Sequence, residues 1–495
     1  MKSEANRFFA TQAWVQGDWA SNVLLEVDAT GHWSKVQAHA PEDQRQGAQV
    51  LSGAVLPGLV NAHSHAFQRA IAGLTERRSI EGGGATPRSA QVKEERPKGA
   101  GDTEQNAASP RHLGASDNFW TWRDRMYTAA NRISPEQLEA IATQLYAELL
   151  QGGYTQVCEF QYLHNDLDGS PYADPAEMSL ALVRAAQRTG IGLTLLPTLY
   201  MRSGFAANGL REDQRRFAST PDSIARIVES VQRQTKDDAR IHVGIALHSL
   251  RAVPPAALNA LATYAQTKSL PVHIHIADQT QEVADCLAPT GQRPIEWLLN
   301  HAAVDLRWNL VHATHTTAQE LAGIAKAGAS IVICPSTEAN LGDGVFDLPG
   351  YAAVQGRWSI GSDSHMTRSW TEELRLLEYS QRLTLRQRNV AAQGLGHTST
   401  AAALLQAALA GGSGAAGCAL GGIAVGQRAD FVVLDGASPA LLGIPADDLL
   451  DAQVFSSPSS LPLEVWLAGH QRPSCSPSNA RTFAWVMESL WSPDR

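Results

Sequence analysis

The distribution of apolar and polar residues divides this chain of 495 residues into three parts. Residues 12–55 form short alternating segments separated by glycines, a pattern typical of small antiparallel β structure. From residue 58 to about residue 361, short apolar runs alternate with longer stretches of helical periodicity. A β pattern returns at residues 429–435, after a helical tract and the glycine-rich residues 411–422.

The middle part predicts repeated βα units. Helical stretches such as residues 176–189 and 222–235 follow apolar runs that we interpret as strands, at residues 154–159, 192–197, 241–247, 271–276, 308–312 and 330–334. Continuous apolar strands require a parallel sheet with both faces covered, either a barrel or a doubly wound sheet. The simplest arrangement is a central barrel flanked by a β module that both termini build.

Residues 79–116 interrupt this pattern. They are rich in glycine, proline and charge and contain almost no apolar residues. Such a segment cannot bury enough surface to offset the entropy of ordering it, so we predict a disordered surface insertion, with an active-site lid as the less favoured alternative.

Composition narrows the class of protein. The net charge of −9 comes without a basic stripe, which argues against nucleic acid as a partner, and no apolar run is long enough to span a membrane. The five cysteines are scattered and odd in number, as in reduced thiols of a cytoplasmic enzyme. The first residues contain no signal-like apolar region. We therefore expect a cytoplasmic protein.

The chemistry-bearing residues are found at the ends of the predicted strands. His63 and His65 are two residues apart at the end of an apolar strand, so both imidazoles point to the same side and can share a metal ion. His273, His275, His312 and Asp363 end three further strands. In a βα barrel the catalytic residues gather at the C-terminal ends of strands. This clustering favours a metal site over histidines that merely cap loops.

These strand ends resemble the amidohydrolase superfamily and, within it, the family of formimidoylglutamate deiminases. The resemblance covers most of the chain and is carried by residues 61–69, Phe119-Trp120-Thr121-Trp122-Arg123, residues 159–164, His248-Ser249-Leu250-Arg251, residues 334–344 and residues 361–365. It implies a (β/α)8 TIM-like barrel of the metal-dependent hydrolase type, with a small β-sandwich domain from both termini. The expected divisions are residues 1–57, 58–420 and 421–495, the last with a terminal helix.

The resemblance also implies a metal site and a mechanism. His63, His65, His275 and Asp363 would hold one zinc ion per subunit, with Fe²⁺ or Mn²⁺ as alternatives. The third and fourth strands of the expected barrel, at residues 193–200 and 241–248, contain no lysine. This absence disfavours the two-metal members of the superfamily. Asp363 would also take the proton of the metal-activated water, and His312 would stabilise the tetrahedral intermediate.

One position departs from the family pattern. The proton shuttle, expected to be glutamate three residues after His275, is Asp278. Aspartate is shorter by about 1.5 Å, the length of one C–C bond. Either the backbone compensates, or activity falls, or the substrate differs; Glu282 is a less favoured candidate for the same role.

For the substrate, the resemblance points to Arg123 and Arg251, with Gln68, Tyr162 and His248 as polar partners. Paired guanidinium groups suit a dicarboxylate. The expected reaction is the hydrolytic deimination of N-formimino-L-glutamate to N-formyl-L-glutamate and ammonia, a step of histidine degradation. The expected assembly is a homodimer. The alternatives are the same chemistry on formiminoaspartate or on an aminated heterocycle such as guanine, and a non-catalytic scaffold.

Overall fold

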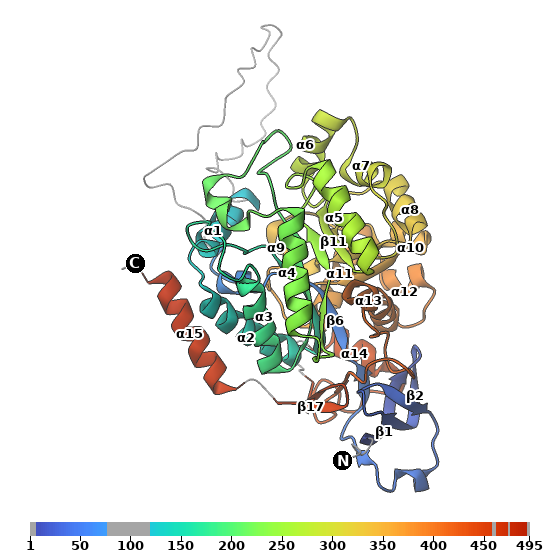
Figure 1. The fold of residues 1–495 in the computed structure, drawn as a ribbon. Helices are drawn as coiled ribbons and strands as arrows, with labels where there is room; N and C mark the ends of the chain where they lie inside the picture. Colours follow the sequence, from blue (N-terminus) through green and yellow to red (C-terminus); the bar gives the residue numbers. More distant parts are fainter. Residues whose placement is uncertain (1–5, 77–118, 458–461, 474–475, 493–495) are drawn as a thin grey trace, which may run out of the picture.

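The computed structural model describes residues 6–76, 119–457, 462–473 and 476–492 (Figure 1). The predicted insertion at residues 79–116 lies outside these ranges. The described part contains two sheets: a parallel sheet at the centre, surrounded by helices, and a separate sheet from the two ends of the chain.

The central sheet is the predicted barrel. Its strands are parallel neighbours in the order β6-β7-β8-β10-β11-β12-β13-β14, and β9 pairs with β8. They span β6 (Leu59–Ser64), β7 (Tyr154–Gln161), β8 (Gly192–Leu199), β9 (Ile241–Val243), β10 (Ile245–Leu247), β11 (Val272–Ile276), β12 (Trp308–His312), β13 (Ser330–Ile333) and β14 (Arg357–Ile360). Apart from the exposed Arg357 and the half-buried His242, their residues are all buried, because barrel strands have packed side chains on both faces.

Helices cover the outside of the barrel (Figure 1). They are α1 (Phe119–Ala130), α2 (Pro135–Gln151), α3 (Glu177–Thr189), α4 (Pro221–Gln234), α5 (Pro255–Lys268), α6 (Thr280–Thr290), α7 (Pro294–His301), α8 (Ala318–Ala327), α9 (Pro335–Leu341), α10 (Leu348–Ala353), α11 (Trp370–Leu385), α12 (Val390–Leu395), α13 (Thr400–Ala416), α14 (Leu449–Phe455) and α15 (Pro477–Trp491). Short 3₁₀ segments include η2 (Ala66–Ala70) and η3 (Glu212–Phe217). The expected helices at 176–189 and 222–235 match α3 and α4 to within one residue.

The barrel closes between its first and last strands. The Asp363 N–H donates to the His63 carbonyl at 3.0 Å, and the His65 N–H donates to the Asp363 carbonyl at 3.2 Å. Gly361 permits this approach, since a Cβ there would lie 2.6 Å from the His63 Cβ. Closure therefore brings the His-x-His motif beside an aspartate 298 positions away, between residues 65 and 363.

Both termini build the second sheet, as predicted. Its order is β17-β16-β15-β5-β1-β2-β3, with β4 paired to β1, and its strands span β1 (Asn6–Val15), β2 (Asp18–Val27), β3 (Trp33–Gln37), β4 (Gln49–Val50), β5 (Val55–Pro57), β15 (Phe431–Val433), β16 (Glu464–Leu467) and β17 (His470–Arg472). The hydrogen bonds form one continuous sheet that folds over itself. Phe8 of β1 packs against Trp466 of β16, three strands away, with ring centroids 5.0 Å apart. The exact domain divisions stay a prediction.

The glycine-rich residues 411–422 begin inside a helix. Helix α13 continues through Gly411 and Gly412 to Ala416. The reason is close packing, since a Cβ on Gly411 would lie 1.9 Å from the Trp358 carbonyl oxygen of β14. These glycines let α13 lie directly on the barrel.

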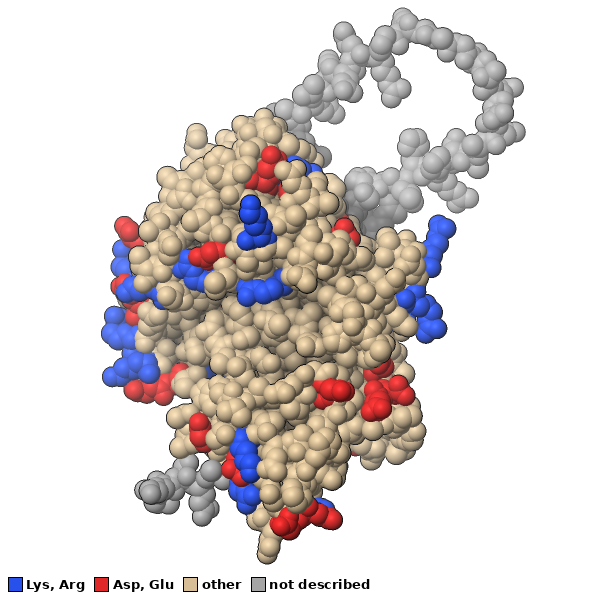
Figure 2. Space-filling model, turned by 90° about the vertical axis from the view of Figure 1, so that its right-hand side faces the viewer, with Lys and Arg blue, Asp and Glu red and all other residues tan. Residues whose placement is uncertain are grey.

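The surface carries charge of both signs. On the face drawn in Figure 2, acidic and basic side chains are interspersed over the tan surface. No helix within the described ranges combines the length and the apolar character needed to cross a bilayer.

Candidate metal centre and active site

The four predicted metal ligands converge at one end of the barrel. Ligand atoms of His63, His65, His275 and Asp363 all lie within 4.8 Å of one another. The His275 Nε2 lies 3.0 Å from the His63 Nε2 and 3.3 Å from the His65 Nε2. The Asp363 Oδ1 lies 3.4 Å from the His63 Nε2 and 3.3 Å from the His65 Nε2.

This geometry fits a tetrahedral metal ion. Zinc–nitrogen bonds of about 2.0–2.1 Å give a tetrahedral edge of about 3.3–3.4 Å, close to the four separations above. Burial lowers the pKa of His63, His65 and His275, so these imidazoles are neutral at pH 7 and carry the lone pairs that bind metal. The donor set of three nitrogens and one carboxylate oxygen suits zinc.

Neighbouring groups fix the orientation of the ligands. The Nδ1 atoms of His65 and His275 each lie 2.9 Å from a backbone carbonyl, of Phe160 and His248 respectively, so Nε2 faces the metal centre. Glu159 secures the motif itself: its carboxylate accepts from the Ser64 hydroxyl at 2.7 Å and from the Ala66 N–H at 2.5 Å. Burial raises the pKa of Glu159 to about 7.

The backbone around the centre is strained. Several residues other than glycine have a positive φ angle here: Ala277 (53°), His312 (69°), Ala313 (51°), Asp363 (44°) and His365 (66°). Such conformations cost about 1–3 kcal/mol each and persist where surrounding contacts enforce them. Here they turn side chains at three strand ends toward the same centre.

His312 and Asp363 face each other across the site. The Asp363 Oδ2 lies 3.8 Å from the His312 Nε2, while its other oxygen belongs to the metal-ligand group. On the far side of the ring, Nδ1 lies 3.3 Å from Glu338 Oε1. Burial opposes protonation of His312, but Asp278, Cys334 and Glu338 together raise its pKa well above the ordinary value.

Asp278 lines the same cavity. Its Oδ1 is 3.9 Å from His312 Nδ1 and has no hydrogen-bond partner among the described residues. Glu282, one helical turn further on, is buried and accepts from the Asp278 N–H at 3.2 Å. Burial raises the pKa of Glu282, while Arg251 opposes that rise. Glu282 thus supports the backbone of Asp278 and does not line the cavity itself.

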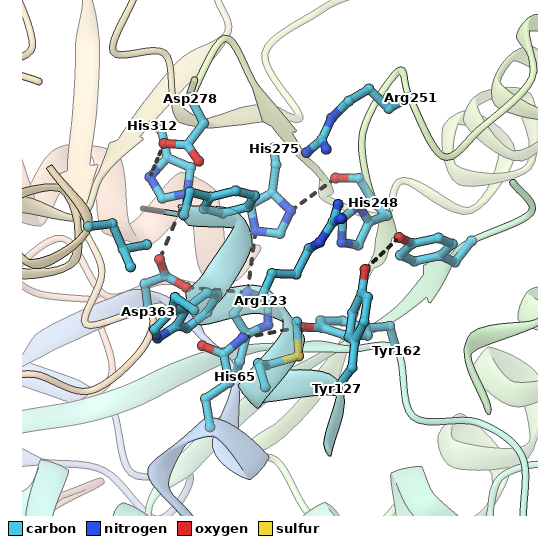
Figure 3. Close-up of a pocket in the computed structure, with 16 residues that line it drawn as sticks. His65, Arg123, Tyr127, Tyr162, His248, Arg251, His275, Asp278, His312 and Asp363 are labelled. Atoms are coloured by element: carbon cyan, nitrogen blue, oxygen red, sulfur yellow. Dashed lines mark hydrogen bonds and ion pairs between the residues drawn. The ribbon is translucent and has the colours of Figure 1, made fainter. Parts of the chain in front are cut away.

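The five predicted substrate residues all line this cavity (Figure 3). The Gln68 Nε2 donates to the Tyr162 hydroxyl at 3.1 Å. Arg123 and Arg251 lie over the Trp120 ring, with Cζ 4.3 Å and 5.7 Å from its centroid. Trp120 thus supports both guanidinium groups.

Unsatisfied polar atoms converge in the cavity. Among the described residues, the buried Gln68 Oε1, Arg123 Nε, Arg251 Nε and Asp278 Oδ1 have no hydrogen-bond partner. Buried polar atoms are normally paired, so four such atoms around one cavity indicate a polar ligand. Two of the four come from arginines, which indicates an anionic ligand.

Three further histidines near the strand ends have structural contacts. The Nε2 atom of each lies near a backbone carbonyl: His164 near Thr198 at 2.8 Å, His273 near Ala415 at 2.9 Å and His365 near His65 at 3.0 Å. Two groups of side chains among the described residues could hold a metal ion, and His315 belongs to neither: His63, His65, His275 and Asp363, and His312, Cys334 and Glu338.

Sequence reasoning missed several residues of the site. The cavity is also lined by Phe119, Trp122, Met126, Tyr127, Tyr200 and Leu341. Tyr127 lies on α1 one helical turn after Arg123, and that spacing was a signal for it; Tyr200, directly after β8, carried none.

Comparison with known proteins agrees with this geometry. The model of the amidohydrolase family matches residues 54–472. A formimidoylglutamate deiminase from Pseudomonas aeruginosa is 44% identical over 491 residues, covering 97% of this chain and 99% of that one. An 8-oxoguanine deaminase from the same species is 25% identical over 66% of this chain and 64% of its own. The crystal structure of an amidohydrolase from Brucella melitensis superposes with a TM-score of 0.85 at 38% identity, covering 98% of this chain and 100% of that one.

The family match spans the whole barrel and much of the terminal sheet, and the ligand atoms of the metal centre lie where the sequence placed them. The non-catalytic scaffold has no support from a site that retains every expected ligand. The chain belongs to the amidohydrolase family and is a metal-dependent hydrolase.

Proposed function

We propose that the protein hydrolyses N-formimino-L-glutamate to N-formyl-L-glutamate and ammonia. The observation that carries this proposal is a single cavity that joins the metal-ligand group to two arginines with unpaired donors. The metal-ligand group is suited to hydrolysis of a C–N bond, and the two arginines are suited to binding two carboxylates. The identity of 44% to a deiminase of that name supports the same substrate.

The metal-ligand residues define where the reaction starts. His63, His65, His275 and Asp363 would hold one zinc ion, which supplies a nucleophilic water at neutral pH and Lewis acidity toward the substrate. The Asp363 Oδ2, which faces His312, would accept the proton of the attacking water. The His312 Nε2, 3.8 Å from that oxygen, would stabilise the charge that develops on the tetrahedral intermediate.

The departing nitrogen needs a proton, since ammonia leaves and amide anion does not. Asp278 is the carboxylate of the cavity that is not a metal ligand, and its unpaired Oδ1 would carry the proton to that nitrogen. The amidine carbon gains one oxygen from water and loses one nitrogen, so the products are a formamide and ammonia.

The arginines would hold the glutamate part of the substrate. Arg123 comes from α1 and Arg251 from the loop after β10, so they approach the cavity from different elements (Figure 3). Arg202 fixes the second loop by donating to the carbonyls of Arg251 and Leu250, each at 3.0 Å. Gln68, Tyr162 and His248 complete the polar wall.

A substrate panel tests the proposal. Metal-replete protein is incubated with formiminoglutamate, formiminoaspartate and guanine, and ammonia is measured with a coupled assay. We expect the highest kcat/KM for formiminoglutamate, with N-formyl-L-glutamate identified by NMR as the carbon product. Preference for guanine would overturn the assignment of the substrate. Release of formamide with free glutamate would show that a different C–N bond is cleaved.

The assembly and location stay proposals. We infer a homodimer, and we infer a cytoplasmic location in keeping with the four free thiols among the described residues (Cys158, Cys286, Cys334 and Cys418). Light scattering on the purified protein would decide the number of subunits.

A further inference from the structure

Three buried side chains form a hydrogen-bonded triangle at the edge of the cavity. Gln214 of η3 donates through Nε2 to the Tyr127 hydroxyl at 3.0 Å and to the Tyr200 hydroxyl at 2.9 Å. The two hydroxyl oxygens are 3.4 Å apart. Gln214 is 1% exposed, and the tyrosines are 4% and 5% exposed. Both tyrosines line the cavity, and Gln214 supports them from behind.

The orientation of the Gln214 amide is fixed by the backbone. Its Oε1 accepts from the Arg211 N–H at 3.1 Å, so the NH₂ group faces the tyrosines. An amide NH₂ has two hydrogens, and each serves one phenol oxygen. Tyr127 and Tyr200 therefore both accept from Gln214, and both keep their own hydrogen to donate.

The two phenols together keep two hydroxyl hydrogens, and the gap between their oxygens has room for one of them. Within the described ranges, the tyrosines have no other hydrogen-bond acceptor than each other. Only one hydrogen can lie between two oxygens, so the second is free to point into the cavity. Burial raises the pKa of Tyr200 well above its ordinary value, which keeps this phenol a donor at neutral pH.

The free hydrogen lies beside the two arginines. The Arg123 Cζ is 5.5 Å from the Tyr127 ring centroid, and Tyr200 interacts electrostatically with Arg251 and Arg123. Figure 3 shows the hydroxyl end of Tyr127 turned toward the part of the cavity where Arg123 and Arg251 lie. A carboxylate accepts hydrogen bonds and donates none, so it is the group that satisfies all three donors.

We propose that the Tyr127–Tyr200 pair donates one hydroxyl hydrogen to a substrate carboxylate, next to Arg123 and Arg251. This inference rests on the proposed function, in which the substrate is a dicarboxylate. The pair makes these tyrosines specificity-determining residues: a carboxylate gains a charge-assisted hydrogen bond, whereas a neutral heterocycle edge gains a weaker one. Because either phenol can supply the hydrogen, the two are interchangeable donors.

That interchange gives a test by double-mutant cycle. In Tyr127→Phe or Tyr200→Phe, the remaining hydroxyl still accepts from Gln214 and still donates into the cavity. We expect each single variant to raise KM for formiminoglutamate by less than about threefold, and the double variant to raise it about tenfold or more, as for loss of a hydrogen bond to a charged group. The kcat should stay within about twofold, since the reacting atoms are untouched.

A second variant leaves both hydroxyls in place. Gln214→Glu replaces the donor by an acceptor, so both phenols turn their hydrogens toward it. Its KM should rise as much as that of the double variant or more. Tyr264→Phe is the control, because Tyr264 lies on α5 and does not line the cavity.

Binding of glutarate, measured by calorimetry, separates this inference from the proposed function. If the wild-type protein binds glutarate but does not turn over formiminoglutamate, the proposed function fails and the donor pair is judged by glutarate alone. A double variant that binds glutarate about tenfold more weakly, with an unchanged melting temperature, supports the inference. Double-variant KM and glutarate affinity within twofold of wild type overturn it, as does wild-type protein that binds no glutarate.

Discussion

Position 278 carries aspartate where the family resemblance implies glutamate, and the structure shows how far this carboxylate reaches. The Asp278 Oδ1 lies 3.9 Å from the His312 Nδ1. A hydrogen bond of this type needs about 2.7–3.2 Å, so the carboxylate falls short by about 1 Å. Asp278→Glu adds one C–C bond, about 1.5 Å, which more than covers the shortfall.

The expected effect follows from that displacement. A catalytic group misplaced by about 1 Å can cost on the order of 100-fold in rate. We therefore expect Asp278→Glu to raise kcat for formiminoglutamate by about tenfold, with 100-fold as the upper bound, and to change KM little. The assay is steady-state ammonia release at saturating substrate, with metal content matched between preparations.

Two controls make the result interpretable. Asp278→Asn keeps the size of the side chain and removes the proton carrier, so kcat should fall by about 10²–10⁴. Asp285→Glu makes the same lengthening on α6, outside the cavity, and should change nothing. If Asp278→Glu lost tenfold in kcat while retaining metal and melting temperature, the site would be built around aspartate and the reasoning from reach would be wrong.

Three further results are expected. His63→Ala should lose about one equivalent of metal by elemental analysis, and full retention would place the metal elsewhere. Glu159→Gln should weaken metal binding about 10–100-fold in a chelator competition, because the carboxylate fixes the strand that carries the histidines; unchanged affinity would contradict this. Burial raises the pKa of Glu373 from 4.5 to about 8, so its contribution to stability is full below pH 4.5 and is lost as the pH rises through 8. Glu373→Gln should therefore flatten the fall in melting temperature between pH 5 and 9, and an unchanged slope would refute the assignment.

The part of the site that sequence could predict is the part that regular structure positions. A two-residue spacing on a strand puts His63 and His65 on one side, and parallel strands bring His275 and His312 to the same end of the barrel. Asp363 reaches them because the barrel closes through the backbone pairing with His63. The pattern of strands left open whether the sheet closed, so closure could be expected only from the family resemblance.

The residues that sequence did not identify depend on packing between loops. Tyr200 follows β8 and Gln214 lies in η3, and neither has a periodic position that points to the cavity. The glycines of α13 are a related case. A glycine that permits close packing of a helix on a sheet has the same local signature as one that ends a helix, and only the neighbour at 1.9 Å, the Trp358 carbonyl, distinguishes them.

Backbone strain and unpaired polar atoms occur together around the cavity. Each buried polar atom without a partner destabilises the fold by about 1–3 kcal/mol, a large part of a domain's stability of about 5–15 kcal/mol. Gln68, Arg123, Arg251 and Asp278 keep such atoms around a single cavity, beside the positive-φ residues of the strand ends. An apolar replacement at any of them would relieve that cost, and a polar ligand in the cavity would satisfy all four atoms. The two guanidinium groups favour an acceptor-rich ligand, which a dicarboxylate is and guanine is not.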